Sequence, residues 1–181
     1  MPELPEVETT VLGIKRYALG LSIEKVWTDY KSPHYIGKDE IKDPAFFLKF
    51  KKAIVGAKII SADRRAKNIL ISLSNEQTIV IHMKMTGHIL YGTYKETKSG
   101  WVSSEAGPLK DDPFNRHIRL VFSLSNKKHL ALSDLRRFAK VTYVKTDEIH
   151  SSKHLAQTGP EPLHETFTLS SFKKRILLRA N

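Results

Sequence analysis

The sequence predicts a mainly β protein with helices, in which an antiparallel β-sandwich or flattened barrel carries an amino-terminal helix and a second short helix. Three observations support this fold class. The chain opens with a run of helical periodicity, a proline-initiated helix follows near residue 44, and seven short segments rich in Ile, Val, Leu and Tyr come after it. Closely spaced strands with few helices between them are typical of antiparallel sandwiches and barrels.

Two helices are expected before the strand-rich part of the chain. Residues 5–19 carry apolar side chains at steps of four, three and four, as on one stripe of an amphipathic helix: Val7, Val11, Ile14 and Ala18. Gly20 supplies a helix stop. Further along, Asp43 and Pro44 indicate an N-cap and a first helical position, and they open a short helix that ends at Gly56.

The strands are expected in short segments that turn residues separate. Ile23 to Trp27 alternates like a half-buried strand. The other seven segments are residues 57–62, 68–74, 79–83, 89–94, 117–124, 130–133 and 140–144. Between the fourth and fifth of these, residues 95–116 contain Gly100, Gly107, Pro108 and Pro113, and we expect a long mobile loop there that is too polar for a core element.

The charge balance favours a polyanionic partner. Thirty Lys and Arg against nineteen Asp and Glu give the 181 residues a formal charge of +11. Counterion release favours the binding of such positively charged chains to nucleic acid. Binding to an anionic membrane, or a need for solubility alone, would explain the same positive charge. The sequence has no run of eighteen apolar residues, no Cys and no metal-ligand spacing among its eight His. We therefore expect no membrane span, no disulfide and no metal.

The amino terminus carries the most reactive arrangement in the sequence. Removal of Met1 would leave Pro2 as a secondary amine, with Glu3 and Glu6 one and four residues behind it. At pH 7 roughly a tenth of an α-amine is neutral, against less than about a thousandth of a Lys ammonium. Such a cluster suits covalent attack on an electrophilic carbon, with a carboxylic acid nearby to move protons. The plainer interpretation is an ordinary helix start, with Pro in the first turn and acids that suit the helix dipole.

The segment from Pro2 to Thr9 resembles the amino terminus of bacterial formamidopyrimidine-DNA glycosylases. Three further segments match that family in the same order, namely residues 63–68, 81–87 and 133–140, so the resemblance covers nearly all of the chain. It implies a bifunctional DNA glycosylase and abasic-site lyase that acts on oxidised purines, formamidopyrimidine and 8-oxoguanine, in double-stranded DNA.

The resemblance also implies a mechanism. The nitrogen of Pro2 attacks C1′ of the damaged nucleoside, the base departs, and a Schiff base forms; β- and δ-elimination then remove the phosphates. Glu3 is expected to transfer protons at the sugar, and Glu6 to position groups around it. Leu4, in place of Gly, favours the purine-specific branch over the endonuclease VIII branch that acts on oxidised pyrimidines. A DNA-binding fragment without catalysis is the alternative from a different class.

The same match assigns DNA contacts to the three internal segments. Lys67 would contact the phosphate next to the damaged nucleotide, as part of the catalytic set, and His82 would contact a second phosphate. Met85 would enter the space left by the everted nucleotide, Phe138 would wedge beside the lesion, and Arg136 would bond the orphaned base. Arg136 and Phe138 are two residues apart, so in extended chain they point the same way. Taken alone, these segments would be a solvated basic turn, a structural His, a core Met and a strand end with surface arginines.

The sequence also departs from the family pattern. Ala139 stands where Gly is usual, and residues 114–117 keep only the last His, His117, of a His-x-His element, so the geometry of both loops is in question. Residues 167–178 look like the first helix of a helix-two-turn-helix domain, while the rest of that domain and the family's four-Cys zinc finger are absent. We therefore expect a catalytic domain at 1–145, a linker at 146–166 and an incomplete domain at 167–181. The expected protein is a monomeric, cytoplasmic, nucleoid-associated fragment with reduced activity and no cofactor.

Overall fold

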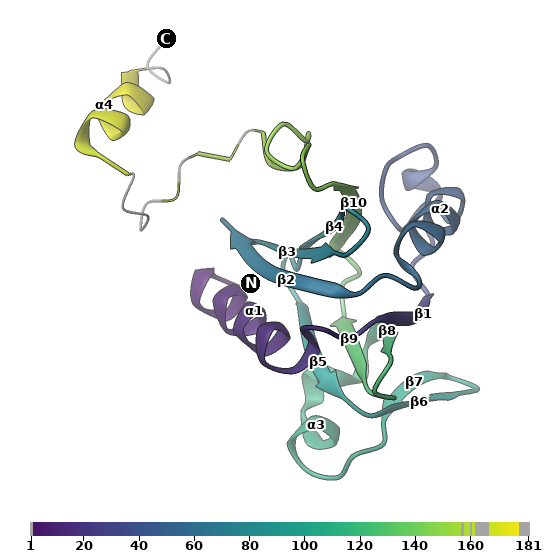
Figure 1. The fold of residues 1–181 in the computed structure, drawn as a ribbon. Helices are drawn as coiled ribbons and strands as arrows, with labels where there is room; N and C mark the ends of the chain where they lie inside the picture. The colour runs from purple at the N-terminus through teal and green to yellow at the C-terminus, as the bar shows by residue number, and fades with distance from the viewer. Residues whose placement is uncertain (1, 157, 160, 162–166, 178–181) are drawn as a thin grey trace.

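The computed structural model describes residues 2–156, 158, 159, 161 and 167–177, and its main body is a sandwich of two four-stranded antiparallel sheets (Figure 1). The first sheet has the strand order β1 (Ile23–Thr28), β8 (Ile118–Leu124), β9 (His129–Asp134) and β5 (Gly87–Gly92). The second has the order β10 (Lys140–Lys145), β4 (Gln77–His82), β3 (Asn68–Leu73) and β2 (Ile59–Arg65). The predicted fold class is confirmed, with two open sheets in place of a closed barrel.

Helix α1 (Leu4–Ala18) closes one side of the sandwich. It contacts β2 and β5, the edge strands of the second and first sheets (Figure 1). The predicted apolar stripe is buried: Val7, Val11, Ile14 and Ala18. Each fully buried Val or Ile contributes about 1.5–3 kcal/mol, so the stripe fixes where the first residues of the chain lie against the sheets.

Helix α2 (Pro44–Ile54) begins and packs as its sequence predicts. The side chain of Asp43 accepts a hydrogen bond from the backbone N–H of Ala45 at 2.9 Å, which caps the helix start. Phe50 is fully buried, and its ring centroid lies 6.4 Å from Phe122 of the first sheet and 6.0 Å from Tyr143 of the second. One aromatic side chain thus fastens α2 to both sheets.

The expectation of a polar loop at residues 95–116 is wrong. This stretch contains most of a hairpin, β6 (Tyr94–Thr97) and β7 (Gly100–Ser103), followed by α3 (Pro108–Asp111) and the 3₁₀ turn η2 (Pro113–Arg116). Two contacts of aromatic residues order this segment in spite of its polar composition. Trp101 lies 6.3 Å from Trp27 between ring centroids, and the buried Tyr94 donates a hydrogen bond to Asn115 at 3.0 Å. The tryptophan pair holds the segment against the first sheet, and the Tyr94–Asn115 bond joins η2 to the hairpin.

Beyond β10 the chain stays in contact with the sandwich before it reaches α4 (Leu169–Leu177). Ile149 and Leu155 are buried against Leu70 and Val80 on the outer face of the second sheet. The first part of the expected linker therefore packs on the sandwich, and α4 lies apart from it in Figure 1. Among the described residues, no helix is both long and apolar enough to span a membrane.

Candidate active site

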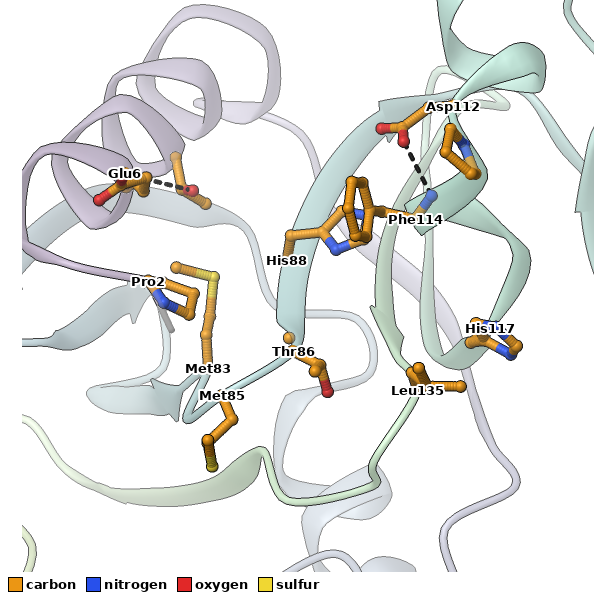
Figure 2. Close-up of a pocket in the computed structure, with 13 residues that line it drawn as sticks. Pro2, Glu6, Met83, Met85, Thr86, His88, Asp112, Phe114, His117 and Leu135 are labelled. Atoms are coloured by element: carbon orange, nitrogen blue, oxygen red, sulfur yellow. Dashed lines mark hydrogen bonds between the residues drawn. The ribbon is translucent and has the colours of Figure 1, made fainter.

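A cavity of about 660 Å³ lies beside the amino terminus (Figure 2). Helix α1 forms one side of the cavity, and the segment around η2 forms the opposite side. The β4–β5 turn forms the floor. Its lining residues are Pro2, Glu6, Thr10, Met83, Met85, Thr86, Gly87, His88, Asp112, Pro113, Phe114, His117 and Leu135. The cavity therefore contains the predicted nucleophile, one predicted carboxylate and the predicted wedge Met85.

The residues around Pro2 divide between the cavity and the surface next to it. Glu6 reaches back along the first helical turn, and its Oε2 accepts a hydrogen bond from the backbone N–H of Glu3 at 2.9 Å. Glu3 lies outside the cavity lining, where its Oε1 is 3.1 Å from Nζ of Lys67. The two carboxylates thus have different partners: Glu6 accepts a hydrogen bond from the backbone of Glu3, and Glu3 pairs with Lys67.

Lys67 reaches Glu3 because it lies on a tight hairpin turn. Arg65 of β2 pairs with Asn68 of β3, so Ala66 and Lys67 form a two-residue turn. Ala66 has φ +48°, in the left-handed region that non-glycine residues rarely adopt. The turn therefore requires contacts from its surroundings that hold it in this conformation.

The β4–β5 turn places Met85 in the cavity wall and depends on glycine. Gly87 donates its N–H to the carbonyl oxygen of Met83 at 3.1 Å. A Cβ at Gly87 would lie 2.5 Å from that same oxygen, which is closer than van der Waals contact allows. Lys84, in the same turn, has φ +58°. Only a residue without a side chain fits at Gly87. The tight turn that this glycine allows places Met85 in the cavity wall.

His82 lies at the start of this turn but faces a different cavity. Its Nδ1 accepts a hydrogen bond from the N–H of Lys84 at 3.0 Å, and it lines a cavity of about 380 Å³ together with Lys140. Burial, and then the neighbouring charges of Lys84 and Lys140, lower the pKa of His82 to about 4. At neutral pH the imidazole is uncharged, and with Nδ1 as the acceptor its Nε2 carries the proton.

The three predicted DNA-intercalating residues form one cluster. The guanidinium of Arg136 lies 4.5 Å from the ring centroid of Phe138 and donates to Sδ of Met85 at 3.2 Å. Phe138 and Met85 are 46% and 43% exposed. The expected extended chain between Arg136 and Phe138 is wrong, because Arg137 has φ +57° and the segment is a turn. The two side chains nevertheless meet across it.

A buried carboxylate that the sequence analysis missed organises this turn. Asp134, at the end of β9, is fully buried and accepts hydrogen bonds from the Tyr30 hydroxyl at 2.8 Å, the Thr86 hydroxyl at 2.5 Å and the Ala139 N–H at 2.8 Å. Thr86 in turn accepts from the N–H of Arg136 at 3.1 Å. The sequence did contain a signal for this role, because Asp134 ends an apolar strand just before a turn rich in arginine.

The two departures from the family pattern are accommodated in different ways. Ala139 is fully buried, its N–H is used by Asp134, and its φ is not among the positive values of the chain. Glycine is therefore not required at this position. His117 follows η2 and lines the cavity that contains Pro2.

The far wall of the cavity comes from residues that the sequence analysis did not connect with the site. Phe114 is 71% exposed and lies edge-on to His88, with 6.2 Å between ring centroids. Asp112 accepts a hydrogen bond from the N–H of Phe114 at 2.8 Å (Figure 2). Burial lowers the pKa of His88, which stays neutral at pH 7. The wall is aromatic and mostly uncharged, as suits contact with a planar ring.

Metal-ligating side chains do not gather here. Within the described part of the chain, no group of three or more His, Asp or Glu residues is arranged to hold a metal ion.

Comparison with known proteins identifies related sequences. A family model described as "Formamidopyrimidine-DNA glycosylase N-terminal domain" matches residues 1–141. The formamidopyrimidine-DNA glycosylase of Pelotomaculum thermopropionicum is 35% identical over 179 residues, which are 99% of this chain and 56% of that protein. The enzyme of the same name from Desulforamulus reducens is 33% identical over 180 residues, with the same two shares. The chain thus spans little more than half the length of these relatives.

Solved structures share the fold. Lactococcus lactis Fpg, in a complex with DNA that contains an abasic site, matches 97% of this chain and 55% of its own, with a TM-score of 0.72 and 22% identity. MutM in a complex with DNA that contains carbocyclic 8-oxo-G matches 97% of this chain and 57% of its own, with a TM-score of 0.72 and 23% identity. At this level of identity the likeness establishes the arrangement of helices and strands.

Proposed function

The chain belongs to the formamidopyrimidine-DNA glycosylase family, and on that premise we propose that it acts in DNA repair through Schiff-base chemistry at Pro2 on oxidised purine nucleotides. The observation that carries this proposal is the shared cavity of about 660 Å³, which Pro2 and Glu6 border from one side and Met85 from another. A nucleotide turned out of the duplex would bring its C1′ to the nitrogen, while Met85 occupies the space it left.

The proposed reaction needs a free amine, which removal of Met1 supplies. The Pro2 nitrogen attacks C1′, the C1′–N bond to the base breaks, and the base leaves with a proton. The sugar ring then opens to an iminium ion, which stabilises the electron pair released when a C2′ proton is removed. Elimination of the 3′ and then the 5′ phosphate follows. A group near the sugar must therefore give a proton to O4′ when the ring opens and then accept the protons lost from C2′ and C4′, and water finally hydrolyses the iminium ion to release Pro2.

We assign proton transfer to Glu3 and its orientation to Glu6 and Lys67. Glu6 is committed to the N–H of Glu3 at 2.9 Å, so it is less free to move protons itself. The Glu3 side chain is 61% exposed, and its 3.1 Å pair with Lys67 keeps it beside the amino terminus. Lys67 can then exchange this partner for a DNA phosphate when the duplex binds.

The remaining contacts would hold the distorted duplex. Unstacking a base costs a few kcal/mol, and apolar wedges with a hydrogen-bonding cation compensate for it. The cluster of Met85, Arg136 and Phe138 provides these groups side by side. His82 would donate from Nε2 to a phosphate oxygen as a neutral group.

Borohydride trapping tests the proposal. An intact-mass measurement first confirms that the protein lacks Met1. This protein is mixed with duplex DNA that contains an abasic site, and sodium borohydride reduces any Schiff base to a stable adduct. Peptide mapping should place the adduct on Pro2, and Pro2→Gly should slow its formation while the fold persists. Protein that retains Met1 is the matched control and should form no adduct, because its Pro2 nitrogen is an amide. An adduct on Lys67, or none at all, would refute the mechanism.

A further inference from the structure

The carboxylate of Glu161 lies against the turn that carries Lys67, although 94 residues separate them. Its Oε1 accepts a hydrogen bond from the N–H of Ala66 at 2.5 Å and lies 3.2 Å from the Arg65 guanidinium, and its Oε2 lies 3.1 Å from that of Arg64. Only 19% of the Glu161 side chain is exposed. Arg65 also donates to the carbonyl oxygen of Gly159 at 2.6 Å. The segment is therefore held by both backbone and side chain.

The Glu161 carboxylate is the ionised partner in these contacts. Partial burial by itself would raise the pKa of Glu161, but the hydrogen bond from Ala66 and the charges of Arg64 and Arg65 outweigh it and lower the pKa. Hydrogen bonds to a charged acceptor are roughly twice as strong as neutral ones. The bond to Ala66 N–H also supports a residue at φ +48°, a conformation that is unfavourable for a non-glycine residue.

The same turn is joined to helix α1 at two points. Arg64 donates from Nε to Oε2 of Glu8 at 2.8 Å, and Lys67 pairs with Oε1 of Glu3 at 3.1 Å. Arg64, Arg65 and Lys67 are three cations within four residues, whereas Glu3 and Glu8 supply two carboxylates. Glu161 supplies the third. Without it, Arg65 would lose its carboxylate partner, Arg64 would keep Glu8 alone, and the N–H of Ala66 would lose its acceptor.

We propose that Glu161 is a positioning residue, which binds Ala66, Arg64 and Arg65 and so holds the Ala66–Lys67 turn where Lys67 reaches Glu3. The inference rests on the proposed function for its catalytic consequence, but the contact itself is independent of that function. The proposal adds Glu161, a residue that follows the β-sandwich in the chain, to the groups that support the site around Pro2.

Glu161→Gln tests the proposal, with Glu148→Gln as the matched control. Glu148 is an exposed carboxylate paired with Lys145, so both changes remove one negative charge. Each should leave affinity for a duplex with an uncleavable abasic analogue unchanged or slightly tighter, since less charge repels the phosphates. The rate of borohydride trapping at saturating DNA should fall about tenfold in Glu161→Gln alone, because mispositioned groups lose rate without losing binding. Glu161→Asp, which keeps the charge, should recover part of the rate.

A second measurement does not depend on activity. Lys67 should react several-fold faster with an amine-acylating reagent in Glu161→Gln, as mass spectrometry of the labelled peptide would show, and the amide hydrogen of Ala66 should exchange faster. Labelling of Lys145 serves as the internal reference. If wild-type protein forms no trapped adduct while these two changes occur, the proposed function fails and the positioning contact stands. Equal trapping rates in both Gln variants, or unchanged labelling and exchange, would overturn the inference.

Discussion

The guanidinium of Arg136 lies over the ring of Phe138, with 4.5 Å between its central carbon and the ring centroid. A cation–π contact at an exposed site is worth about 0.5–1 kcal/mol, which is less than a base-specific hydrogen-bond pair gains. The contact can therefore hold both side chains ready in the free protein and yield when DNA arrives. Arg136 also contacts Met85, so all three groups are gathered on one side of the cavity that contains Pro2.

Phe138→Ala should reduce trapping on a duplex abasic site by about tenfold or more, because the protein must then unstack the duplex without its wedge. On a single-stranded abasic site, where less stacking is broken, the loss should be no more than about threefold. Trapping rates on the two substrates give the comparison. Leu48→Ala, which removes an exposed apolar side chain from α2, is the control and should alter neither rate. Equal losses on both substrates would mean that Phe138 only supports the fold.

Periodicity and turn chemistry predicted the helices and strands well because local sequence decides them. The stripe on α1 and the Asp43 cap of α2 are local signals, and both are present as expected. The segment 95–116 was misjudged because its order comes from Trp101, which packs on Trp27 of β1, and from Asn115, which accepts a hydrogen bond from the buried Tyr94. Average polarity carries no information about such long-range anchors.

The site was only partly predictable for the same reason. Family resemblance pointed to Pro2, Met85 and Phe138, but the far wall with Phe114 depends on how η2 folds back over β5. Asp134 was missed because a carboxylate after a strand is usually exposed, and only the fold surrounds it with three donors.

Asp134→Ala should cost about 3 kcal/mol or more of unfolding free energy, because a fully buried acceptor of three hydrogen bonds disappears and leaves their donors unpaired. Tyr30→Phe, which removes a single donor, should cost about 1 kcal/mol. Burial and then the Asp134 charge raise the pKa of Tyr30, so its hydroxyl stays a donor throughout the neutral range. Urea denaturation measures both losses. Similar values for the two variants would show that the Thr86 and Ala139 bonds contribute little.

Gly87→Ala should destabilise the protein by about 1–3 kcal/mol and lower duplex trapping, since a Cβ cannot fit 2.5 Å from the Met83 carbonyl oxygen unless the Met85 turn moves. Gly13→Ala is the matched control. Gly13 lies inside α1 with no atom within 4 Å of an added Cβ, so Ala there should stabilise the helix by about 1 kcal/mol. Thermal unfolding of the two variants should shift in opposite directions, and a shift in the same direction would contradict the close approach at Gly87.

His82 should make the protein less stable in acid. Its folded pKa of about 4 lies below the usual 6.5, so between these values the unfolded chain takes up a proton that the folded protein does not. Stability therefore falls as pH drops through this window, and above pH 6.5 the effect vanishes. In His82→Gln the stability difference between pH 7.5 and pH 5 should shrink by about 1–2 kcal/mol, with allowance for partial exposure. Denaturation at both pH values measures it, and an unchanged difference would mean that His82 titrates normally.

The neutrality of His82 also separates its proposed DNA contact from that proposed for Lys67. A cation that neutralises a phosphate releases counterions and adds about 0.9 to the slope of log affinity against log salt, whereas a neutral N–H donor adds none. At pH 7.5, Lys67→Gln should lower that slope by about 0.9, while His82→Gln should weaken binding by a similar factor at every salt concentration. Fluorescence anisotropy with an abasic-analogue duplex between about 50 and 200 mM salt gives both slopes. Lys52→Gln, on the exposed side of α2, is the control for a charge outside the site. A slope that falls as much for His82→Gln as for Lys67→Gln would show that DNA protonates the imidazole on binding.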